Sequence, residues 1–453
     1  MMLLLDFLKD ILSEPAFLMG LIACFGLIAL KSPAHKVMTG TLGPILGYLM
    51  LAAGAGVIVT NLEPLSKMIE TGFHITGVVP NNEAVTSVAQ KVLGVETMSI
   101  LVAGLAFNLL IARFTRFKYI FLTGHHSFFM ACLLSAVLGA LDFKGLTLIL
   151  VGGFILGAWS AISPAIGQHY TIKATDGDEI AMGHFGSLGY YLSAWIGSLV
   201  GKDSPSTEDI QVSEKWNFLR NSTISTALIM VFFYLIAAIA AGPKFVETLS
   251  AGQNPFIFAI LSGLKFAVGV AIVYAGVRMI LADLIPAFEG VSSRLIPNAV
   301  PAVDCAVFFP YAPTAVIIGF AFSFLGGLIG MLILGMMGGV LIIPGMVPHF
   351  FCGATAGIFG NATGGRRGAM VGAFVNGLLL AFLPAMLLPV LGNLGFSNTT
   401  FGDVDFGVLG ILLGRLGSMA HSTGVYILVA ILAIILIVPS LKGNKDQTIN
   451  HQV

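Results

Sequence analysis

Residues 145–165, GLTLILVGGFILGAWSAISPA, contain no Asp, Glu, Lys, Arg or His. A helix of about 20 apolar residues is long enough to cross the hydrocarbon core of a bilayer. Because that core offers no water to the backbone, a spanning segment satisfies its peptide groups as a helix or within a closed barrel. The length and uniform hydrophobicity of this stretch predict a membrane-spanning helix.

The rest of the chain has the same character. Of 453 residues, 57% are hydrophobic and 10% are charged, whereas about a quarter are charged in soluble proteins. The net charge of zero gives no field that would attract nucleic acid. We expect an all-α polytopic membrane protein of about eleven transmembrane helices, at 16–30, 38–60, 97–113, 119–141, 145–165, 222–242, 255–281, 315–335, 336–358, 369–395 and 421–441.

Two glycine-rich segments, 166–200 and 400–420, are interrupted by polar residues and are predicted to be re-entrant hairpins. Basic residues in short loops favour the cytoplasm, which places the N-terminus outside and the C-terminus inside. Residues 201–221 then form a cytoplasmic loop and 442–453 a cytoplasmic tail. Met1–Glu14 is amphipathic and charged, so we expect an interfacial helix there rather than a signal peptide.

The two halves of the chain, about 16–200 and 222–441, show a weak internal repeat. A shift of 222 residues gives 14 identities over residues 51–131, against roughly 7 expected by chance for this composition. The predicted spans of the two halves run in opposite directions, so the repeat would be inverted. Inverted repeats are common in transporters whose substrate binds between the halves. Under this shift Asn82 falls on Asp304.

Several polar residues lie at predicted membrane depth, where they are costly unless they serve a solute path or find a partner. His125 and His184 stand in Gly-His steps and are candidates for such a path, or else core histidines bonded to the backbone. Asp304 is a candidate acceptor for substrate hydroxyls, or a structural cap. We expect His126 to be structural, and His349 either lines the path or is structural. Asp403 and Asp405 are predicted to be loop residues.

Gly54-Ala55-Gly56 interrupts the second predicted span. Its small residues either allow close helix packing or break the helix and expose backbone groups to a solute. The four cysteines show no paired spacing and are expected to be buried small hydrophobes. The sequence contains no phosphate loop, zinc signature or nucleophile elbow, so we expect no cofactor, no metal and no catalytic residue in this chain.

With these segments in view, the chain resembles the ascorbate-specific membrane subunit, component IIC, of the bacterial phosphoenolpyruvate-dependent sugar phosphotransferase system. The resemblance is carried by Ala53-Gly54-Ala55-Gly56, Leu122-Thr123-Gly124-His125, Gly183-His184, Gly276-Val277-Arg278-Met279, Arg294-Leu295-Ile296-Pro297, Ala302-Val303-Asp304-Cys305-Ala306 and Ile342-Ile343-Pro344-Gly345. It implies a homodimer in the cytoplasmic membrane, each protomer split into a V-shaped dimerisation domain and a substrate-carrying core that moves like an elevator. It also implies separate IIA and IIB partner proteins, because no such domain is expected within residues 1–453.

Residue by residue, the resemblance implies a substrate site made by Gly54, Ala55, Asn82, His125, His184 and Asp304. Two positions depart from the family, because Phe129 and Phe185 stand where the family has glutamines. Each missing amide removes a hydrogen bond worth about 0.5–1.5 kcal/mol, whereas a ring could stack on a flat lactone or sugar. We therefore expect L-ascorbate or a related sugar acid or polyol as the substrate.

A different class of function is an ion-coupled transporter or facilitator that releases its solute unmodified, with Asp304 as a proton or sodium site. A membrane-embedded enzyme acting on lipid is disfavoured, because no metal cluster or nucleophile–base pair is recognisable in the sequence. Phosphorylated product inside vesicles would distinguish group translocation from ion coupling.

Overall fold

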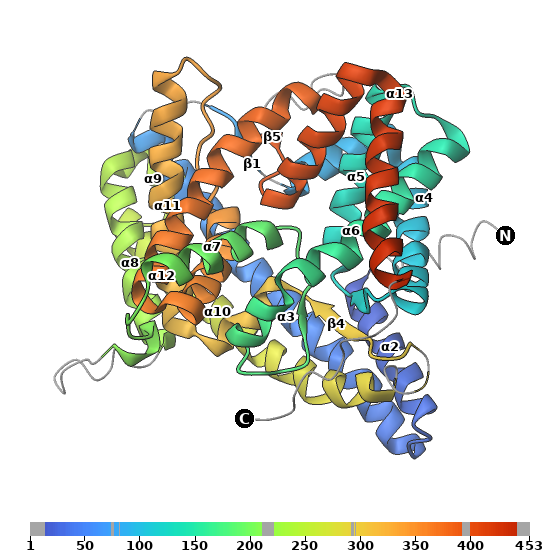
Figure 1. Cartoon of the computed structure of the whole chain (residues 1–453). Coiled ribbons are helices and arrows are strands. Elements are labelled where there is room, and N and C mark those ends of the chain that lie inside the picture. The colour runs from blue at the N-terminus through green and yellow to red at the C-terminus, as the bar shows by residue number, and fades with distance from the viewer. Residues whose placement is uncertain are drawn as a thin grey trace.

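The computed structural model describes residues 14–73, 77–80, 82–210, 222–290, 294, 296–391 and 399–441. Within these ranges the chain is almost wholly helical, with short strands between some helices (Figure 1). The predicted interfacial helix at the N-terminus, the tail at 442–453 and most of the loop at 201–221 lie outside the described residues. Those three remain predictions.

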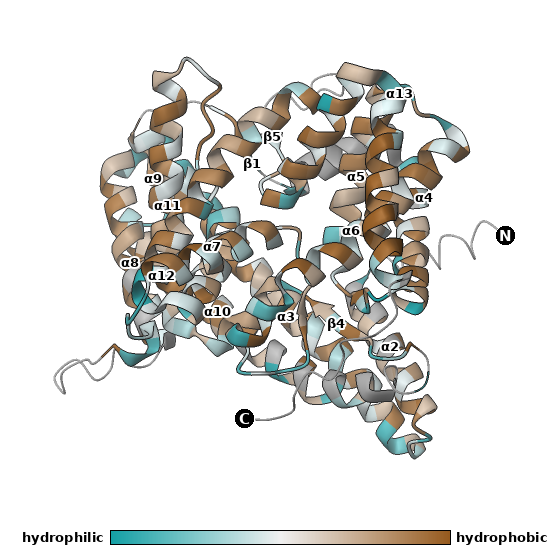
Figure 2. Cartoon of the chain, in the orientation of Figure 1, coloured by the Kyte–Doolittle hydropathy of each residue, from teal (hydrophilic) through white to brown (hydrophobic). Residues whose placement is uncertain are grey.

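The helices are long and apolar, as the composition predicts (Figure 2). In the described residues, seven helices could each cross a bilayer, and an eighth crossing results if two helices bent 114° apart form one span. That bent pair is α8 (Ser222–Ala241) and α9 (Pro243–Leu249). The other α-helices are α2 (Pro15–Ala29), α3 (Ala34–Gly72), α4 (Asn82–Phe114), α5 (Gly124–Ala140), α6 (Gly145–Ala174), α7 (Ser187–Val200), α10 (Pro255–Gly290), α11 (Pro313–Met336), α12 (Met346–Leu391) and α13 (Val404–Leu441).

All eleven predicted segments fall on helices, but they are not eleven separate long spans. Helices α2 and α5 have only 15 and 17 residues. The predicted spans 336–358 and 369–395 share α12, which is interrupted at Gly364 and Gly365. This interruption lies in the interval 359–368 that the prediction leaves between the two spans, where Arg366 and Arg367 also interrupt the apolar run. By length and composition, the structure supports seven or eight crossings.

The ends of the predicted segments are also corrected. The predicted span 336–358 begins too early, because residues 337–345 form an apolar turn before α12, where Gly338 has a φ of 68°. Of the predicted hairpin 166–200, the first part continues α6 and the last part forms α7. The predicted hairpin 400–420 falls on the first arm of α13, which breaks at Ala420 and His421.

The helices pack in two groups. We call α2, α3, α8, α9 and α10 the scaffold group, and α4 to α7 with α11 to α13 the core group; packing is dense within each and sparse between them. In the scaffold group α3 and α10 cross at glycines, since a Cβ on Gly54 would lie 2.8 Å from the Gly269 carbonyl oxygen. The helix α3 runs through Gly54 without a break.

In the described residues, five short strands lie between the helices. β4 (Val300–Val303) lies between β2 (Tyr119–Phe121) and β3 (Ala181–Met182), and β1 (Val79–Pro80) pairs with β5 (Thr399–Thr400). All these pairings are parallel. Strand pairing satisfies backbone groups that would otherwise be unpaired. Because the carboxyl ends of parallel strands meet at one edge, the residues that follow each strand are brought together.

Candidate functional site

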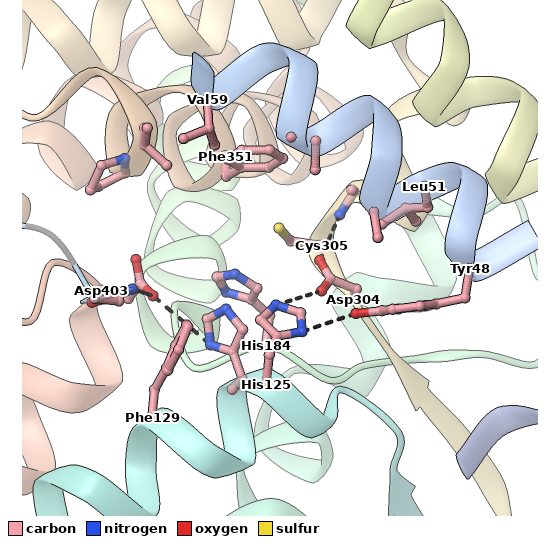
Figure 3. A pocket seen from close by; sticks show the side chains of 18 of the residues that line it. Tyr48, Leu51, Val59, His125, Phe129, His184, Asp304, Cys305, Phe351 and Asp403 are labelled. Carbon is pink, nitrogen blue, oxygen red and sulfur yellow. Dashed lines mark hydrogen bonds and ion pairs between the residues drawn. The ribbon is translucent and has the colours of Figure 1, made fainter. Parts of the chain in front are cut away.

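A cavity of about 530 Å³ lies between α3 and the core group, within the range of small-molecule sites. Each of the five strands is followed, within four residues, by a polar side chain that lines it (Figure 3). These side chains are Asn82 after β1, His125 after β2, His184 after β3, Asp304 after β4 and Asp403 after β5. The facing wall is α3, which contributes Tyr48, Leu51, Ala52, Ala55, Gly56, Val59 and Thr60.

His125 and Asp304, both predicted site residues, lie together. The His125 Nε2 is 3.3 Å from the Asp304 Oδ2, and its Nδ1 is 3.0 Å from the Tyr48 hydroxyl (Figure 3). The other carboxylate oxygen, Asp304 Oδ1, accepts the Ala306 N–H at 3.2 Å and so caps the 3-10 helix Cys305–Tyr311. Asp304 is therefore a structural cap that also lines the cavity, so the two alternatives drawn from the sequence are compatible.

His184 presents a defined ring nitrogen to the cavity. Its Nδ1 accepts the Gly186 N–H at 3.1 Å and lies 2.8 Å from the Tyr190 hydroxyl. A nitrogen that accepts a backbone N–H carries no proton, so in the neutral ring the proton sits on Nε2. Among the described residues no hydrogen bond is made by that Nε2, which leaves an N–H free to donate to a ligand.

His126 lines the cavity, contrary to the prediction that it is only structural. Its ring lies 3.7 Å, centroid to centroid, from the ring of His184. Its Nδ1 accepts the Phe185 N–H at 3.4 Å and is 3.9 Å from the Asp403 Oδ2. The preceding residue His125 also faces the cavity, because it lies in the first turn of α5, where that helix begins at the cavity wall. Three imidazoles therefore share one cavity.

Asp403 is another cavity residue that the sequence did not identify. The sequence predicts a loop residue, yet Asp403 is buried and lines the cavity. The Asn82 amide donates to its Oδ2 at 2.9 Å, and the Cys352 thiol donates to its Oδ1 at 3.0 Å. Since the Asn82 Oδ1 accepts the Gly402 N–H at 2.9 Å, the Asn82 amide is held by the protein itself. Because the partners are far apart along the chain, no local sequence signal indicates this contact.

Asp405, also predicted to be a loop residue, is fully buried in the first turn of α13. Its Oδ2 accepts from the Ser187 hydroxyl at 2.8 Å and from the Trp159 indole at 3.2 Å. Its Oδ1 accepts the Leu188 N–H at 3.0 Å. This carboxylate therefore fixes the start of α7, and with it the loop that carries His184.

The remaining predicted site residues divide into two sets. Ala55 and Phe129 line the cavity as expected. Gly54 does not line it, because it is buried against α10, as the packing alternative for this glycine predicts. Phe185 does not line it either, since its ring is buried and stacks on Phe121 at 4.6 Å. His349 is buried, bonded to the Ser323 hydroxyl at 2.9 Å, and does not line the cavity.

Two sets of side chains in the cavity have the composition of a metal site. His126, His184 and Asp403 form one, and His184, Asp304 and Cys305 form the other; in each, the potential ligand atoms lie within 4.8 Å of one another. The donors would suit a divalent transition ion. Both carboxylates already accept hydrogen bonds, Asp403 from Asn82 and Cys352, and Asp304 from Ala306. The cavity also has room for a polyhydroxylated molecule.

Comparison with known proteins identifies the family of the chain. Residues 10–405 match EIIC-GAT, the PTS system sugar-specific permease component. A relative, the ascorbate-specific PTS system EIIC component of Mycoplasma pneumoniae (strain ATCC 29342 / M129 / Subtype 1), is 26% identical over 452 residues, covering 85% of this chain and 67% of the relative. The family match includes all the cavity-lining residues from Glu14 to Asp403. The chain therefore belongs to the EIIC-GAT family of sugar-specific permeases of the phosphotransferase system, and it is a multi-pass protein of the bacterial inner membrane.

Proposed function

We propose that this permease binds L-ascorbate, or a closely related sugar acid or polyol, in the cavity between its helix groups. It carries the solute across the membrane, where a separate IIB protein phosphorylates it. The observation that carries this proposal is the convergence of three imidazoles and two carboxylates on one cavity. The name of the relative from Mycoplasma pneumoniae supplies ascorbate as the first candidate.

Each polar group then has a role. The His184 Nε2–H donates to an anionic oxygen of the solute, and the neighbouring imidazole of His126 supports a negative charge there. Asp304 and Asp403 accept from the solute's hydroxyl groups, because a carboxylate only accepts. The enolate oxygen is therefore placed at the His184 N–H, and the hydroxyl groups are placed at the two carboxylates. Phe129 and Phe351 line the cavity and offer rings for the flat face of a lactone.

The arrangement of the helices supports an elevator movement. The cavity lies at the boundary between the scaffold and core groups, and four of its polar residues, His125, His184, Asp304 and Asp403, belong to segments packed within the core group. A shift of the core group past α3 would carry these residues with the bound solute. In this proposal the scaffold group is the V-shaped domain that forms a homodimer, and each protomer crosses the membrane eleven times, with the two arms of α12 counted separately.

An inverted repeat is supported by the cavity itself. Four pairs of its lining residues are related by the 222-residue shift: Asn82 with Asp304, His125 with Val347, His126 with Pro348, and Phe129 with Phe351. The backbone pairing is also reciprocal to within one residue. Val78 bridges to Ile342, and its counterpart Val300 pairs with Tyr119. We therefore propose that the solute binds on the axis relating the two halves.

The test is transport into membrane vesicles loaded with phosphoenolpyruvate and the soluble phosphotransfer proteins, including IIA and IIB. Wild-type protein should accumulate phosphorylated L-ascorbate or sugar acid. His184→Ala should assemble normally but lose this uptake, because the free N–H donor is gone. His169→Ala, which removes a histidine outside the cavity, should transport like wild type. Uptake of unmodified solute driven by an ion gradient alone would instead identify an ion-coupled transporter.

A further inference from the structure

Tyr48, on α3, hydrogen-bonds to His125, one of the polar side chains of the core group that line the cavity. It is buried, with 4% of its surface exposed, and its hydroxyl lies 3.0 Å from the His125 Nδ1 (Figure 3). Tyr48 belongs to the scaffold group and His125 to the core group. This hydrogen bond therefore crosses the boundary at which the cavity lies.

The protonation of His125 follows from its two neighbours. Its Nε2 faces the Asp304 carboxylate at 3.3 Å, and because an ionised carboxylate only accepts, the proton of the neutral ring belongs on Nε2. The Nδ1 then carries the lone pair and accepts the hydrogen of the Tyr48 hydroxyl. Both ring nitrogens of His125 contact the protein, whereas the His184 Nε2–H has no hydrogen-bond partner among the described residues.

A solute that uses His125 must therefore replace one of these two contacts. A solute hydroxyl that takes the place of the His125 N–H on the Asp304 Oδ2 frees the imidazole to turn. Once His125 turns toward the solute, its Nδ1 leaves the Tyr48 hydroxyl. Movement of the core group past α3 requires the same hydrogen bond to break, because its two partners lie in different helix groups.

We propose that Tyr48 is a positioning residue for transport: it holds His125 in the solute-free protein and joins the two helix groups until bound solute releases the imidazole. This inference rests on the proposed function, namely that a hydroxylated solute binds in this cavity. Its consequence is that solute binding and freedom of the core group to move are linked through one hydrogen bond. Linkage of this kind is reciprocal, so a bond that resists movement also opposes binding.

Tyr48→Phe tests the inference, because it removes only the hydroxyl. Tyr234→Phe is the matched control, since the buried Tyr234 hydroxyl donates to the Asn61 carbonyl, and both residues lie within the scaffold group. Purified proteins are titrated with L-ascorbate by calorimetry. Tyr48→Phe should bind about 2- to 10-fold more tightly than wild type, the range for loss of one competing hydrogen bond. Tyr234→Phe should bind as wild type does.

A second measurement needs no ligand. Amide hydrogen exchange of solute-free Tyr48→Phe should be faster in the first turn of α5 than in solute-free wild type, whereas solute-free Tyr234→Phe should match wild type there. Tyr48→Met provides the same test if Tyr48→Phe does not assemble. If wild type binds L-ascorbate and Tyr48→Phe matches it in affinity and exchange, the inference is overturned while the proposed function stands. If no variant binds a sugar acid, the proposed substrate fails, and the exchange comparison still decides the role of Tyr48.

Discussion

Side chains around the cavity differ in how much of their hydrogen-bonding capacity remains free. Asn82 accepts the Gly402 N–H with its amide oxygen and donates to Asp403 with its amide nitrogen, so both polar atoms of its side chain already have a protein partner. His125 has both ring nitrogens engaged, whereas His184 keeps one N–H for a ligand. A role in binding therefore depends on the partners that a residue already has, and not only on its presence in the cavity wall.

Phe129 and Phe185, the two phenylalanines that the resemblance singled out, should behave differently when replaced by glutamine. Phe129→Gln places an amide in the cavity wall and should change affinity for L-ascorbate by roughly 2- to 10-fold, measured by calorimetry, because it exchanges a stacking ring for a hydrogen-bonding group. Phe185→Gln should leave the cavity wall unchanged but lower the free energy of unfolding by about 1–3 kcal/mol, since it buries an amide behind His126. Equal effects of both substitutions on affinity would contradict the placement of Phe129 in the cavity wall and Phe185 outside it.

At the scale of elements, the short strands between the long helices lead directly into the cavity wall. The five strands are two to four residues long, too short to form a stable sheet alone, yet their pairing satisfies backbone groups that would otherwise be unpaired. Each strand then ends beside the cavity. The facing wall comes from α3, a continuous helix that presents small residues to both the cavity and α10.

Substitution of two glycines tests whether Gly54 serves packing of α3 on α10 while Gly56 lies in the cavity wall. Gly54→Ala should lower the free energy of unfolding by about 1–3 kcal/mol, because its Cβ would lie 2.8 Å from the Gly269 oxygen and force α3 and α10 apart. Gly56→Ala is the control, since a Cβ there meets nothing within 4 Å. Thermal unfolding in detergent should separate the two variants. If Gly54→Ala unfolds at the wild-type temperature but binds the solute more weakly, the result would support the alternative that backbone groups near Gly54 face the solute.

At the scale of the molecule, the two helix groups meet in few places, and the cavity is one of them. A polar cavity at such a boundary suits a permease, because relative movement of the groups changes access to the site without unfolding either one. The orientation predicted from the basic loops can be measured directly.

Labelling of single introduced cysteines measures the orientation of the chain in the membrane, because the native cysteines are buried or half-buried. Asp203→Cys lies in an exposed turn after α7, and Lys244→Cys lies exposed in α9. With residues 201–221 in the cytoplasm, an impermeant maleimide should label Lys244→Cys in intact cells and Asp203→Cys only after permeabilisation. The reverse pattern would invert the topology.

Some features followed from the sequence alone. The run at 145–165 and ten similar segments determined an all-helical membrane protein, because burial of uncharged side chains in lipid depends on composition and length. His125, His184 and Asp304 could be selected as candidate site residues because polar side chains at predicted membrane depth are costly unless they have a partner or a function. The ordered blocks around them led to the family.

Other features were decided only by the tertiary structure. Asp403 and His126 line the cavity because strands distant in sequence pair and bring the residues that follow them to one cavity. Gly54 does not line it because α3 packs on α10 at that glycine, and Phe185 does not because its ring stacks on Phe121. The backbone angles at Gly364–Gly365 and Ala420–His421 are likewise a feature of the folded chain, although the predicted spans 369–395 and 421–441 already begin just after or at these breaks. Local composition sets whether a segment enters the membrane, whereas contacts between distant segments set which atoms face the solute.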